Sequence, residues 1–376
     1  MNTASKNSSV KSASAASVVS PIRSGDERNP DAIPAAARPG PTQAAPSISR
    51  FCSVARTLAI LSDAWSFLVL REAFFGARRF EQFQSSLGLP RTTLAARLNH
   101  LTGLGLLARE STSGSTRFAY RMTDAGVDLF PTMMVLLAYG DHWLRGEHRP
   151  PLQLVHRTCG KACSPVVVCS ACKGSIDARD VQYRNGPGAG SDPQVAERKR
   201  SRRTTDPTAL ERYRPCSVAR SLRIIGDRWS FLLIREMFFG VRRFDEFQSN
   251  LGIASNILTD RLLHLVEHGV IARRAYQARP ERFEYRFTDK GIDLFNSMIV
   301  MMHWGDKWLS SGKPPLLIRH RSCQHDFHAE VVCSECREVL HAHEVHYFAR
   351  YALDGVVAER AVPRPESDVD VGEERR

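Results

Sequence analysis

The sequence predicts a mainly helical protein with small β elements, an α+β fold that is built from two copies of one unit. Three observations lead to this prediction: a long internal repeat, a change from helical to extended periodicity within each copy, and a short cysteine-rich segment after each copy. The chain of 376 residues is also long enough for two or more domains, and its 43% hydrophobic residues suffice for ordinary cores.

The internal repeat organises the whole chain. Residues 53–107 align without a gap with residues 217–271, at an offset of 164, and 30 of these 55 positions are identical. The motif CSVAR begins at Cys52 and again at Cys216, and both copies contain WSFL and FFG. The match resumes with TD-x-G-x-DLF after a one-residue shift and ends in the cysteine motifs at the original offset. Self-similarity of this kind indicates one structural unit of about 160 residues that occurs twice.

The second copy shows helical periodicity in three stretches. Apolar residues at helical spacing predict a first helix over Ser217–Phe239, which Gly240 would end. A short second helix is predicted over Phe244–Leu251. The third helix is expected to run from Ser255, as its N-cap, to His268.

After the third helix the periodicity changes. Two extended runs flank a basic turn at residues 277–282, which predicts a β-hairpin with a proline at its tip. Thr288 is then expected to cap a long helix over about 289–309, and the first copy has its counterpart over about 125–145. Three helices, a hairpin and a long final helix describe a winged helix-turn-helix with a dimerisation helix attached. Both long helices carry apolar stripes wider than one module can bury, so we expect them to pack together.

The segment CSVARSLRIIGDRWSFLLIREMFFGVRRFDEFQSNLGIASNILTDRLLHLVEHGVIARR resembles the HxlR family of bacterial winged-helix regulators, which are related to the MarR family. The similarity covers about residues 52–146 and 216–311. It implies a cytoplasmic DNA-binding repressor or activator rather than an enzyme. Members of the family usually act as dimers with one module per chain, whereas this chain carries both modules. A pseudo-dimer within one chain is therefore implied; a homodimer, and a small-molecule or redox effector, stay open.

The charge agrees with a polyanionic partner such as double-stranded DNA. The formal net charge is +12 and the sequence pI is about 9.5. No apolar run approaches the roughly 18–20 residues of a membrane span, and no signal peptide is evident, so we expect a cytoplasmic protein without a membrane partner. Nine cysteines in a reducing compartment are then expected to be thiols or metal ligands rather than disulfides.

In a helix-turn-helix the second helix of the motif enters the major groove, and its N-terminal residues reach the base edges. By resemblance these helices are Pro90–Thr102 and Ser255–His268. The copies differ most at this place, with PRTTLAA facing ASNILTD, so we expect the two modules to prefer different half-sites. The predicted DNA contacts, wing tips included, are Arg91, Thr92, Thr93, Arg97, Arg117, Ser255, Asn256, Thr259, Arg261, Arg279 and Arg282. For Arg97 and Arg261, identical in both copies, an intramolecular or phosphate role is an equal alternative, and the wing arginines could belong to solvated loops.

The cysteine-rich units predict metal sites. Each unit has the pattern His-x2-Cys-x9-Cys-x2-Cys, and a Cys-x2-Cys turn directs two thiolates at one ion. We expect about two structural zinc ions per chain, one in each zinc-ribbon-like unit. The expected sets are His156, Cys159, Cys169 and Cys172 in the first unit, and His320, Cys323, Cys333 and Cys336 in the second. Cys163 could replace the first histidine, and His325 or His328 the second. Free thiols or a redox-active disulfide are the alternatives.

Cys52 and Cys216 occupy the same position just before the first helix of each copy. Some members of the family that this chain resembles use a cysteine there as a thiol sensor. The competing interpretation is a partly buried helix-entry cysteine without a special role.

The expected domain organisation follows from these units. A disordered N-terminal tail (1–48) precedes winged helix-turn-helix domain 1 (49–150), cysteine-rich unit 1 (151–184), a linker (185–213), winged helix-turn-helix domain 2 (214–313), cysteine-rich unit 2 (314–349) and a C-terminal tail (350–376). The predicted function is sequence-specific transcription regulation. The alternatives are a thiol-based redox protein and a non-DNA protein-interaction module that uses the Cys/His units.

Overall fold

The computed structural model describes residues 53–61, 64–111, 118–144, 149–190, 210–211, 214–279 and 281–350, and the backbone of residues 352–353 and 356–357. The expected N-terminal tail lies outside these residues. These residues combine helices with small β elements, so the predicted fold class is confirmed. Within the described residues, no helix combines the length and the apolar character that a membrane span requires.

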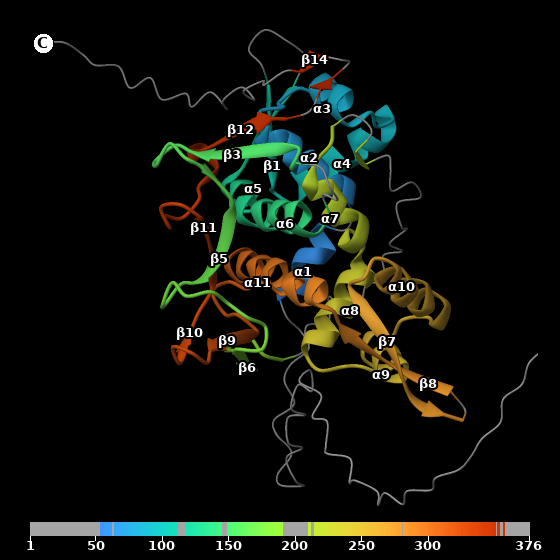
Figure 1. Cartoon of the computed structure of the whole chain (residues 1–376). Coiled ribbons are helices and arrows are strands. Elements are labelled where there is room, and N and C mark those ends of the chain that lie inside the picture. The colour runs from blue at the N-terminus through green and yellow to red at the C-terminus, as the bar shows by residue number, and fades with distance from the viewer. Residues whose placement is uncertain are drawn as a thin grey trace, which may run out of the picture. The chain divides into compact units, whose positions relative to one another are not determined.

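Each repeat forms the elements of a winged helix-turn-helix (Figure 1). The first repeat contains α1 (Ser53–Ile60), α2 (Ala64–Phe74), α3 (Phe80–Leu87), α4 (Arg91–Gly103), β1 (Leu107–Ser111), β2 (Phe118–Met122), α5 (Asp124–Val127) and α6 (Phe130–Trp143). The second contains α7 (Ser217–Ile225), α8 (Arg228–Phe238), α9 (Phe244–Leu251), α10 (Ser255–Glu267), β7 (Ile271–Ala278), β8 (Glu281–Phe287) and α11 (Asp289–Leu309). The paired strands β1–β2 and β7–β8 are the wings.

Four details of the predicted helices are corrected. The expected helix over 217–239 is two helices, because the side chain of Asp227 caps a new helix by accepting from the backbone N–H groups of Trp229 and Ser230. The N-cap of α10 is Ala254 rather than Ser255, and α10 ends at Glu267, one residue early. In the first repeat the long helix is divided into α5 and α6, since Pro131 lacks the N–H that would continue it.

Thr288 caps α11 as predicted. Its hydroxyl oxygen accepts from the backbone N–H of Gly291, and α11 spans 289–309 without a break. Gly240 follows the second helix of its repeat with a φ of 92°, in the left-handed region that the helix end requires.

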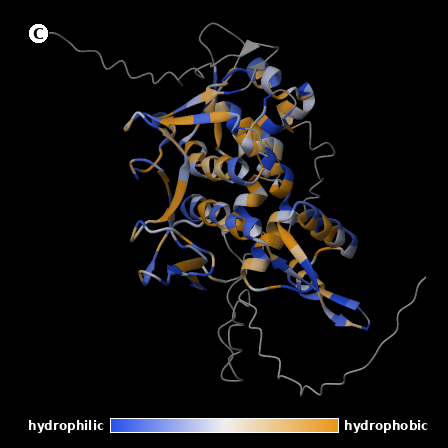
Figure 2. Cartoon of the chain, viewed as in Figure 1, coloured by the Kyte–Doolittle hydropathy of each residue, from blue (hydrophilic) through white to orange (hydrophobic). Residues whose placement is uncertain are grey.

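The two repeats share one core. The long helices α6 and α11 pack against each other, as their apolar stripes predict, and lie side by side in Figure 1. The first helix of each repeat packs on the long helix of the other repeat, so that α1 contacts α11 and α7 contacts α6. The contributing side chains are almost fully buried, among them Met133, Leu136, Met298 and Ile299. Figure 2 shows hydrophobic residues along both α6 and α11.

Polar contacts repeat across this crossed core with the pseudo-symmetry of the sequence. Ser53 donates to Asp306 across the α1–α11 contact, and Ser217 donates to Asp141 across the α7–α6 contact. The hydroxyl of Ser221 donates to the carbonyl oxygen of Leu136 at 2.7 Å. These hydrogen bonds satisfy hydroxyl groups that would otherwise be buried without partners, and they fix the register of the crossed helices.

Glycine permits the close approach of the crossed helices. A Cβ atom at Gly140 would lie 2.2 Å from the carbonyl oxygen of Ser217, and one at Gly305 would lie 2.5 Å from the hydroxyl of Thr57. No side chain fits such a gap without moving one helix away from the other.

The cysteine-rich segments extend the exchange between the repeats. The first contributes β3 (Leu152–His156), β4 (Ala162–Cys163), β5 (Pro165–Cys169) and β6 (Val181–Asn185), and the second contributes β9 (Leu316–His320), β10 (His325–Asp326), β11 (Ala329–Cys333), the 3-10 helix η3 (Ala342–Glu344) and β12 (Val345–Ala349). Strand β3 pairs with β12, β6 with β9 and β5 with β11, all antiparallel and all between repeats. A last short pair, β13 (Ala352–Leu353) and β14 (Val356–Val357), follows.

We expect Gly140→Ala to destabilise the protein by about 1–3 kcal/mol, because the added methyl group overpacks the α6–α7 contact. Gly103→Ala is the matched control, since its Cβ would meet nothing within 4 Å. Urea unfolding followed by circular dichroism measures both variants. Equal midpoints for the two variants would contradict the close-packed crossing.

Candidate nucleic-acid interface and metal centres

The structure places most predicted base-reading side chains on the exposed starts of α4 and α10. Arg91 and Thr92 open α4, and Ser255 and Asn256 open α10; all four are exposed. Thr93 is half-buried, and Thr259 is exposed and donates to the carbonyl oxygen of Ser255 at 2.9 Å.

Local contacts hold two of these side chains in place. The guanidinium group of Arg91 lies 5.0 Å from the ring centroid of Phe80 on α3. The hydroxyl of Ser255 accepts from Gln248 on α9 at 2.7 Å. We call α4 and α10, the helices expected to enter the major groove, the reading helices. Each of the two contacts joins the preceding helix to the start of a reading helix, and so positions the residues that would face DNA.

Arg261 has a different role. Its side chain is buried, and its Nε donates to Asp227 at 2.9 Å, with Asp260 as a second partner. Asp227 is the residue that caps α8, so the ion pair ties the reading helix to the cap of the helix behind it. Arg261 thus makes an intramolecular ion pair, which belongs to the alternative to base readout, and its guanidinium group would have to leave this pair to reach a base. Its counterpart Arg97 is half-buried.

The wing of the second repeat is rich in arginine, although β8 also carries Glu281 and Glu284, and Glu284 pairs with Arg286. Arg279 is exposed at the turn and Arg282 is exposed on β8, as predicted. Arg273, Arg274 and Arg286 lie on the same hairpin and were not predicted as contacts, although arginine recurs throughout ARRAYQARPERFEYRF. The end of this hairpin is hydrophilic in Figure 2. Arg117 of the first wing lies outside the described residues.

Each wing has the same internal cation–aromatic contact. Arg273 lies 4.0 Å from the ring centroid of Phe283, and Arg109 lies 4.0 Å from that of Phe118. The two pairs occupy equivalent positions of the repeat. They join the paired strands of each wing across the side that is exposed to solvent.

The structure brings the eight predicted metal ligands together in two clusters, but not in the expected combinations. Metal site A consists of His156, Cys159, Cys333 and Cys336, and metal site B of Cys169, Cys172, His320 and Cys323. The expected grouping within each cysteine-rich unit is therefore wrong. The physical reason is the antiparallel pairing of β5 with β11, which sets Cys169 opposite Ala329 and Cys333 opposite Pro165. The two Cys-x2-Cys turns thus lie at opposite ends of one ribbon, each beside the His-x2-Cys turn of the other repeat.

The spacing of the ligand atoms suits a tetrahedral ion. Zinc–sulfur bonds of 2.3 Å and zinc–nitrogen bonds of about 2.0 Å require S···S separations of about 3.8 Å and S···N separations of about 3.5 Å. In site A, the Sγ atoms of Cys159 and Cys333 are 3.9 Å apart. The Nδ1 of His156 lies 3.3 Å from the Sγ of Cys336 and 3.8 Å from the Sγ of Cys159.

Site B has matching dimensions. The Sγ atoms of Cys169 and Cys323 are 4.0 Å apart, and the Sγ of Cys172 lies 3.4 Å from the Nδ1 of His320. A hydrogen bond from the backbone N–H of Gly174, assisted by His320, lowers the pKa of the Cys172 thiol to about 7. A thiol that ionises near neutral pH is ready to bind a metal ion.

A carboxylate stands behind each histidine. The Nε2 of His320 lies 3.1 Å from Asp180, and the Nε2 of His156 lies 3.9 Å from Glu344. At 3.1 Å the carboxylate of Asp180 would orient the ring of His320 so that its Nδ1 faces the cysteines, whereas Glu344, at 3.9 Å, lies beyond hydrogen-bond distance from His156. Asp180 and Glu344 were not predicted as site residues, although they lie 164 residues apart, the same offset that relates the ligands of the two repeats.

The alternative ligands are not members of either cluster. Cys163 lies beside site A, where burial, aided by the neighbouring Cys333, raises the pKa of its thiol to about 12. His325 and His328 are exposed. The first histidine of each unit is thus the one that joins the cysteines.

Cys216, at the entrance to α7, is fully buried. It lies in a tightly enclosed space together with Arg71 and Tyr347, which come from the other repeat and from the second cysteine-rich segment. Its counterpart Cys52 lies outside the described residues. The sensor role of this pair stays a prediction, and in the conformation described here Cys216 is not open to solvent.

Among known proteins, one family matches this chain in two regions, one in each repeat. The HxlR-like helix-turn-helix family matches residues 60–148 and residues 224–313. An HTH-type transcriptional regulator of Mycobacterium tuberculosis, MT3179, is 45% identical over 137 residues, which are 36% of this chain and 87% of that protein. A Synechocystis regulator, sll1512, is 35% identical over 95 residues, covering 25% of this chain and 70% of its own. The protein PA1607, whose crystal structure is known, is 34% identical in sequence to this chain. The match covers 35% of this chain and 92% of the PA1607 chain, with a TM-score of 0.33.

We expect Arg261→Ala to lower the free energy of unfolding by about 3 kcal/mol, because it leaves the carboxylate of Asp227 without its buried partner. Asn256→Ala, on the exposed side of the same helix, should change it by less than about 0.5 kcal/mol. Denaturant unfolding of both variants gives the comparison. An unchanged stability of Arg261→Ala would show that the ion pair contributes nothing and would return Arg261 to the DNA-facing set.

Proposed function

The chain belongs to the HxlR-like helix-turn-helix family, and from this membership we propose that it is a transcription regulator whose two reading helices bind one DNA duplex together. The observation that carries the proposal is the crossed core. Because α1 packs on α11 and α7 packs on α6, the two winged modules are parts of one folded unit. The single chain then corresponds to the dimer that one-module relatives would need, and it acts as a pseudo-dimer.

The two modules would read different sequences. The starts of α4 and α10 present different side chains on the same framework, with Arg91 in one and Asn256 in the other. Arginine suits the acceptor pair of guanine, and asparagine suits the acceptor–donor pair of adenine. The proposed operator is therefore an asymmetric pair of half-sites. The basic wing of the second repeat would contact phosphates or the minor groove through Arg279 and Arg282.

We further propose that metal sites A and B each hold one structural zinc ion. Three thiolates and one imidazole are a common ligand set for structural zinc, and all four positions are filled by side chains, which leaves no open position for a substrate. Each ion would join a Cys-x2-Cys turn of one repeat to a His-x2-Cys turn of the other. Zinc would therefore hold the repeats together and take no part in catalysis. We propose a cytoplasmic location, where thiolates of this kind stay reduced.

The DNA-binding proposal is tested with the full chain. Bound sequences are selected from a random DNA pool at fixed salt, and affinities for the selected duplex are measured by fluorescence anisotropy. Asn256→Ala and Arg91→Ala should each cost about 1–3 kcal/mol and relax one base position, in different half-sites. Asn99→Ala, exposed on α4 but outside the predicted DNA contacts, is the comparison variant. A selected consensus that stays unchanged in both variants would refute the proposed readout.

The metal proposal predicts about two zinc ions per chain by elemental analysis. Double variants then distinguish the crossed clusters from ligand sets within one repeat. Cys159→Ser with Cys336→Ser removes two ligands of site A alone, so one metal ion should remain. Cys159→Ser with Cys172→Ser removes one ligand from each site and should lower the content of both. The reverse pattern would support grouping within each repeat, and the absence of zinc from the parent chain would favour redox chemistry of the thiols.

A further inference from the structure

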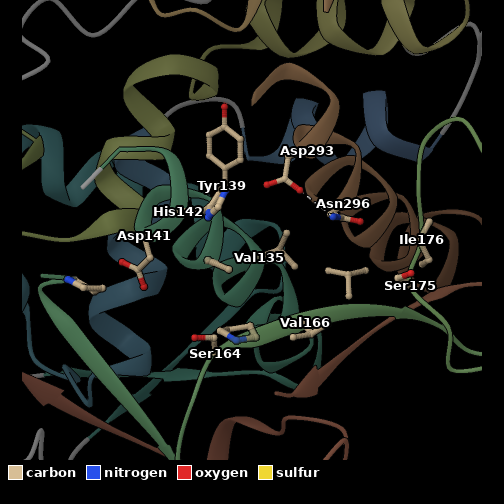
Figure 3. Close-up of a pocket in the computed structure, with 14 residues that line it drawn as sticks. Val135, Tyr139, Asp141, His142, Ser164, Val166, Ser175, Ile176, Asp293 and Asn296 are labelled. Atoms are coloured by element: carbon tan, nitrogen blue, oxygen red, sulfur yellow. Dashed lines mark hydrogen bonds between the residues drawn. The ribbon is translucent and has the colours of Figure 1, made fainter. Parts of the chain in front are cut away.

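A cavity of about 500 Å³ lies between the two repeats. Its walls are α6 of the first repeat, α11 of the second, strand β5 and the segment that contains Ser175 and Ile176 (Figure 3). This volume is within the range of about 300–1,000 Å³ that small-molecule sites occupy. The apolar wall includes Val135, Val166 and Ile176.

The cavity lies where the first repeat has smaller side chains than the second. Ala138 and Ser164 line the cavity, and their counterparts in the second repeat are His303 and His328. The two histidine rings are stacked, with their centroids 4.4 Å apart and an interplanar angle of 14°. The repeats are otherwise pseudo-symmetric here, with Gly140 and Gly305 at equivalent positions of α6 and α11. The pseudo-symmetric core therefore has two equivalent faces that differ here. The cavity face contains Ala138 and Ser164, and the second face contains His303 and His328 in their place.

The charges also differ between the two faces. On the second face Asp128 accepts from the ammonium group of Lys307 at 2.5 Å and from the indole of Trp308 at 2.9 Å. On the cavity face its counterpart Asp293 accepts from the indole of Trp143 at 2.8 Å and from the amide of Asn296 at 3.3 Å. Both of these donors are neutral, and His142 stands where the second face has Lys307. The cavity therefore offers a carboxylate in the place where the other face has a complete ion pair.

Two further buried polar atoms line the cavity: a phenol oxygen that can donate or accept a hydrogen bond, and an amide oxygen that accepts one. The side chain of Tyr139 is 3% exposed, and its hydroxyl has no hydrogen-bond partner among the described residues; the same holds for the Oδ1 of Asn296. Burial, assisted by Asp293, raises the pKa of Tyr139, so that the group is a neutral phenol. A buried polar atom without a partner costs about 1–3 kcal/mol, which a ligand N–H group would recover.

An adjoining hollow continues the same chemistry. It shares His142, Ile176, Asp293 and Asn296 with the cavity and adds two more acidic side chains, Asp177 and Asp289. Its one arginine, Arg179, is bound to Asp177 at 3.0 Å. In a chain with a formal net charge of +12, this acidic region is unsuited to phosphates and suited to a cation.

We propose that this cavity binds a small amphipathic amine, with its ammonium group at Asp293 and its apolar body against Val166 and Ile176. The ligand cation takes the place that Lys307 fills on the other face. Since the walls come from both repeats, occupancy also couples the ligand to the relative position of the two DNA-reading modules. This coupling rests on the proposed function, whereas ligand binding itself does not.

The test uses the full, metal-loaded chain and three probes of similar size: 1-naphthylmethylamine, the uncharged 1-naphthylmethanol and the anionic 1-naphthylacetate. Isothermal titration calorimetry at pH 7 measures binding without DNA. We expect one amine per chain, bound at least tenfold more tightly than the alcohol or the acid. Equal affinity for amine and alcohol would overturn the proposal.

Variants locate the site. Asp293→Asn removes the charge and Ala138→His fills the cavity with the residue of the other repeat; each should weaken amine binding at least tenfold. His303→Ala, on the opposite face, is the matched control and should leave it unchanged. If Ala138→His fails to fold, as judged by circular dichroism, Asp293→Asn decides alone. Amine binding that persists in Asp293→Asn would overturn the site, and it would leave the DNA-binding proposal, measured separately by anisotropy, untouched.

Discussion

The close crossing of α1 over α11 and of α7 over α6 is the contact on which the rest of the structure depends. It brings the first helix of each repeat onto the long helix of the other, at Gly140 and Gly305, where no side chain fits between the backbones. With this crossing in place, the apolar stripes of α6 and α11 are buried together, and the buried hydrophobic residues of both repeats belong to one core. Apolar burial of this extent is the main favourable term in folding, so the exchange between repeats is a source of stability.

The cysteine-rich segments follow from the same exchange. With the long helices side by side, β5 contacts α6 and β11 contacts both α6 and α11, and the two strands pair antiparallel. That pairing sends the Cys-x2-Cys turns to opposite ends of the ribbon, where each meets a histidine from the other repeat. A segment of this size has little core, and metal ligation as proposed would supply folding free energy that burial alone cannot. The proposed metal sites would then join the two halves independently of the apolar core.

Duplication within one chain frees the two halves to differ. In a symmetric dimer any change in the reading helix appears in both half-sites, and any cavity beside one long helix appears beside the other. Here α4 and α10 differ at their exposed starts while their buried leucines are retained. The cavity lining differs in the same way, with Ala138 and Ser164 facing the His303–His328 stack of the other side. Both differences lie on surfaces that a ligand would contact, whereas the crossing itself is retained in both halves.

The sequence alone determined the local structure and the family. Its 3.6-residue periodicity, its glycine stops and the cap at Thr288 fixed α9, α10, the wing and α11 to within one or two residues, because these features depend on neighbours along the chain. It also identified all eight members of the Cys/His clusters, since the 164-residue offset marks them without any knowledge of the fold. The break at Asp227 was missed because a cap inside a continuous apolar pattern leaves the periodicity unchanged.

Only the tertiary structure decided which residues act together. The ligands of each metal site come from different repeats because strand register, which local pattern does not encode, set β5 against β11. The same is true of Arg261: its polar position on a reading helix predicted a DNA contact as readily as an internal one, and the position of Asp227, 34 residues earlier, made it an internal ion pair. The cavity could not be seen in the sequence at all, because it depends on side chains of α6, β5 and α11 that approach one another only after the repeats have crossed.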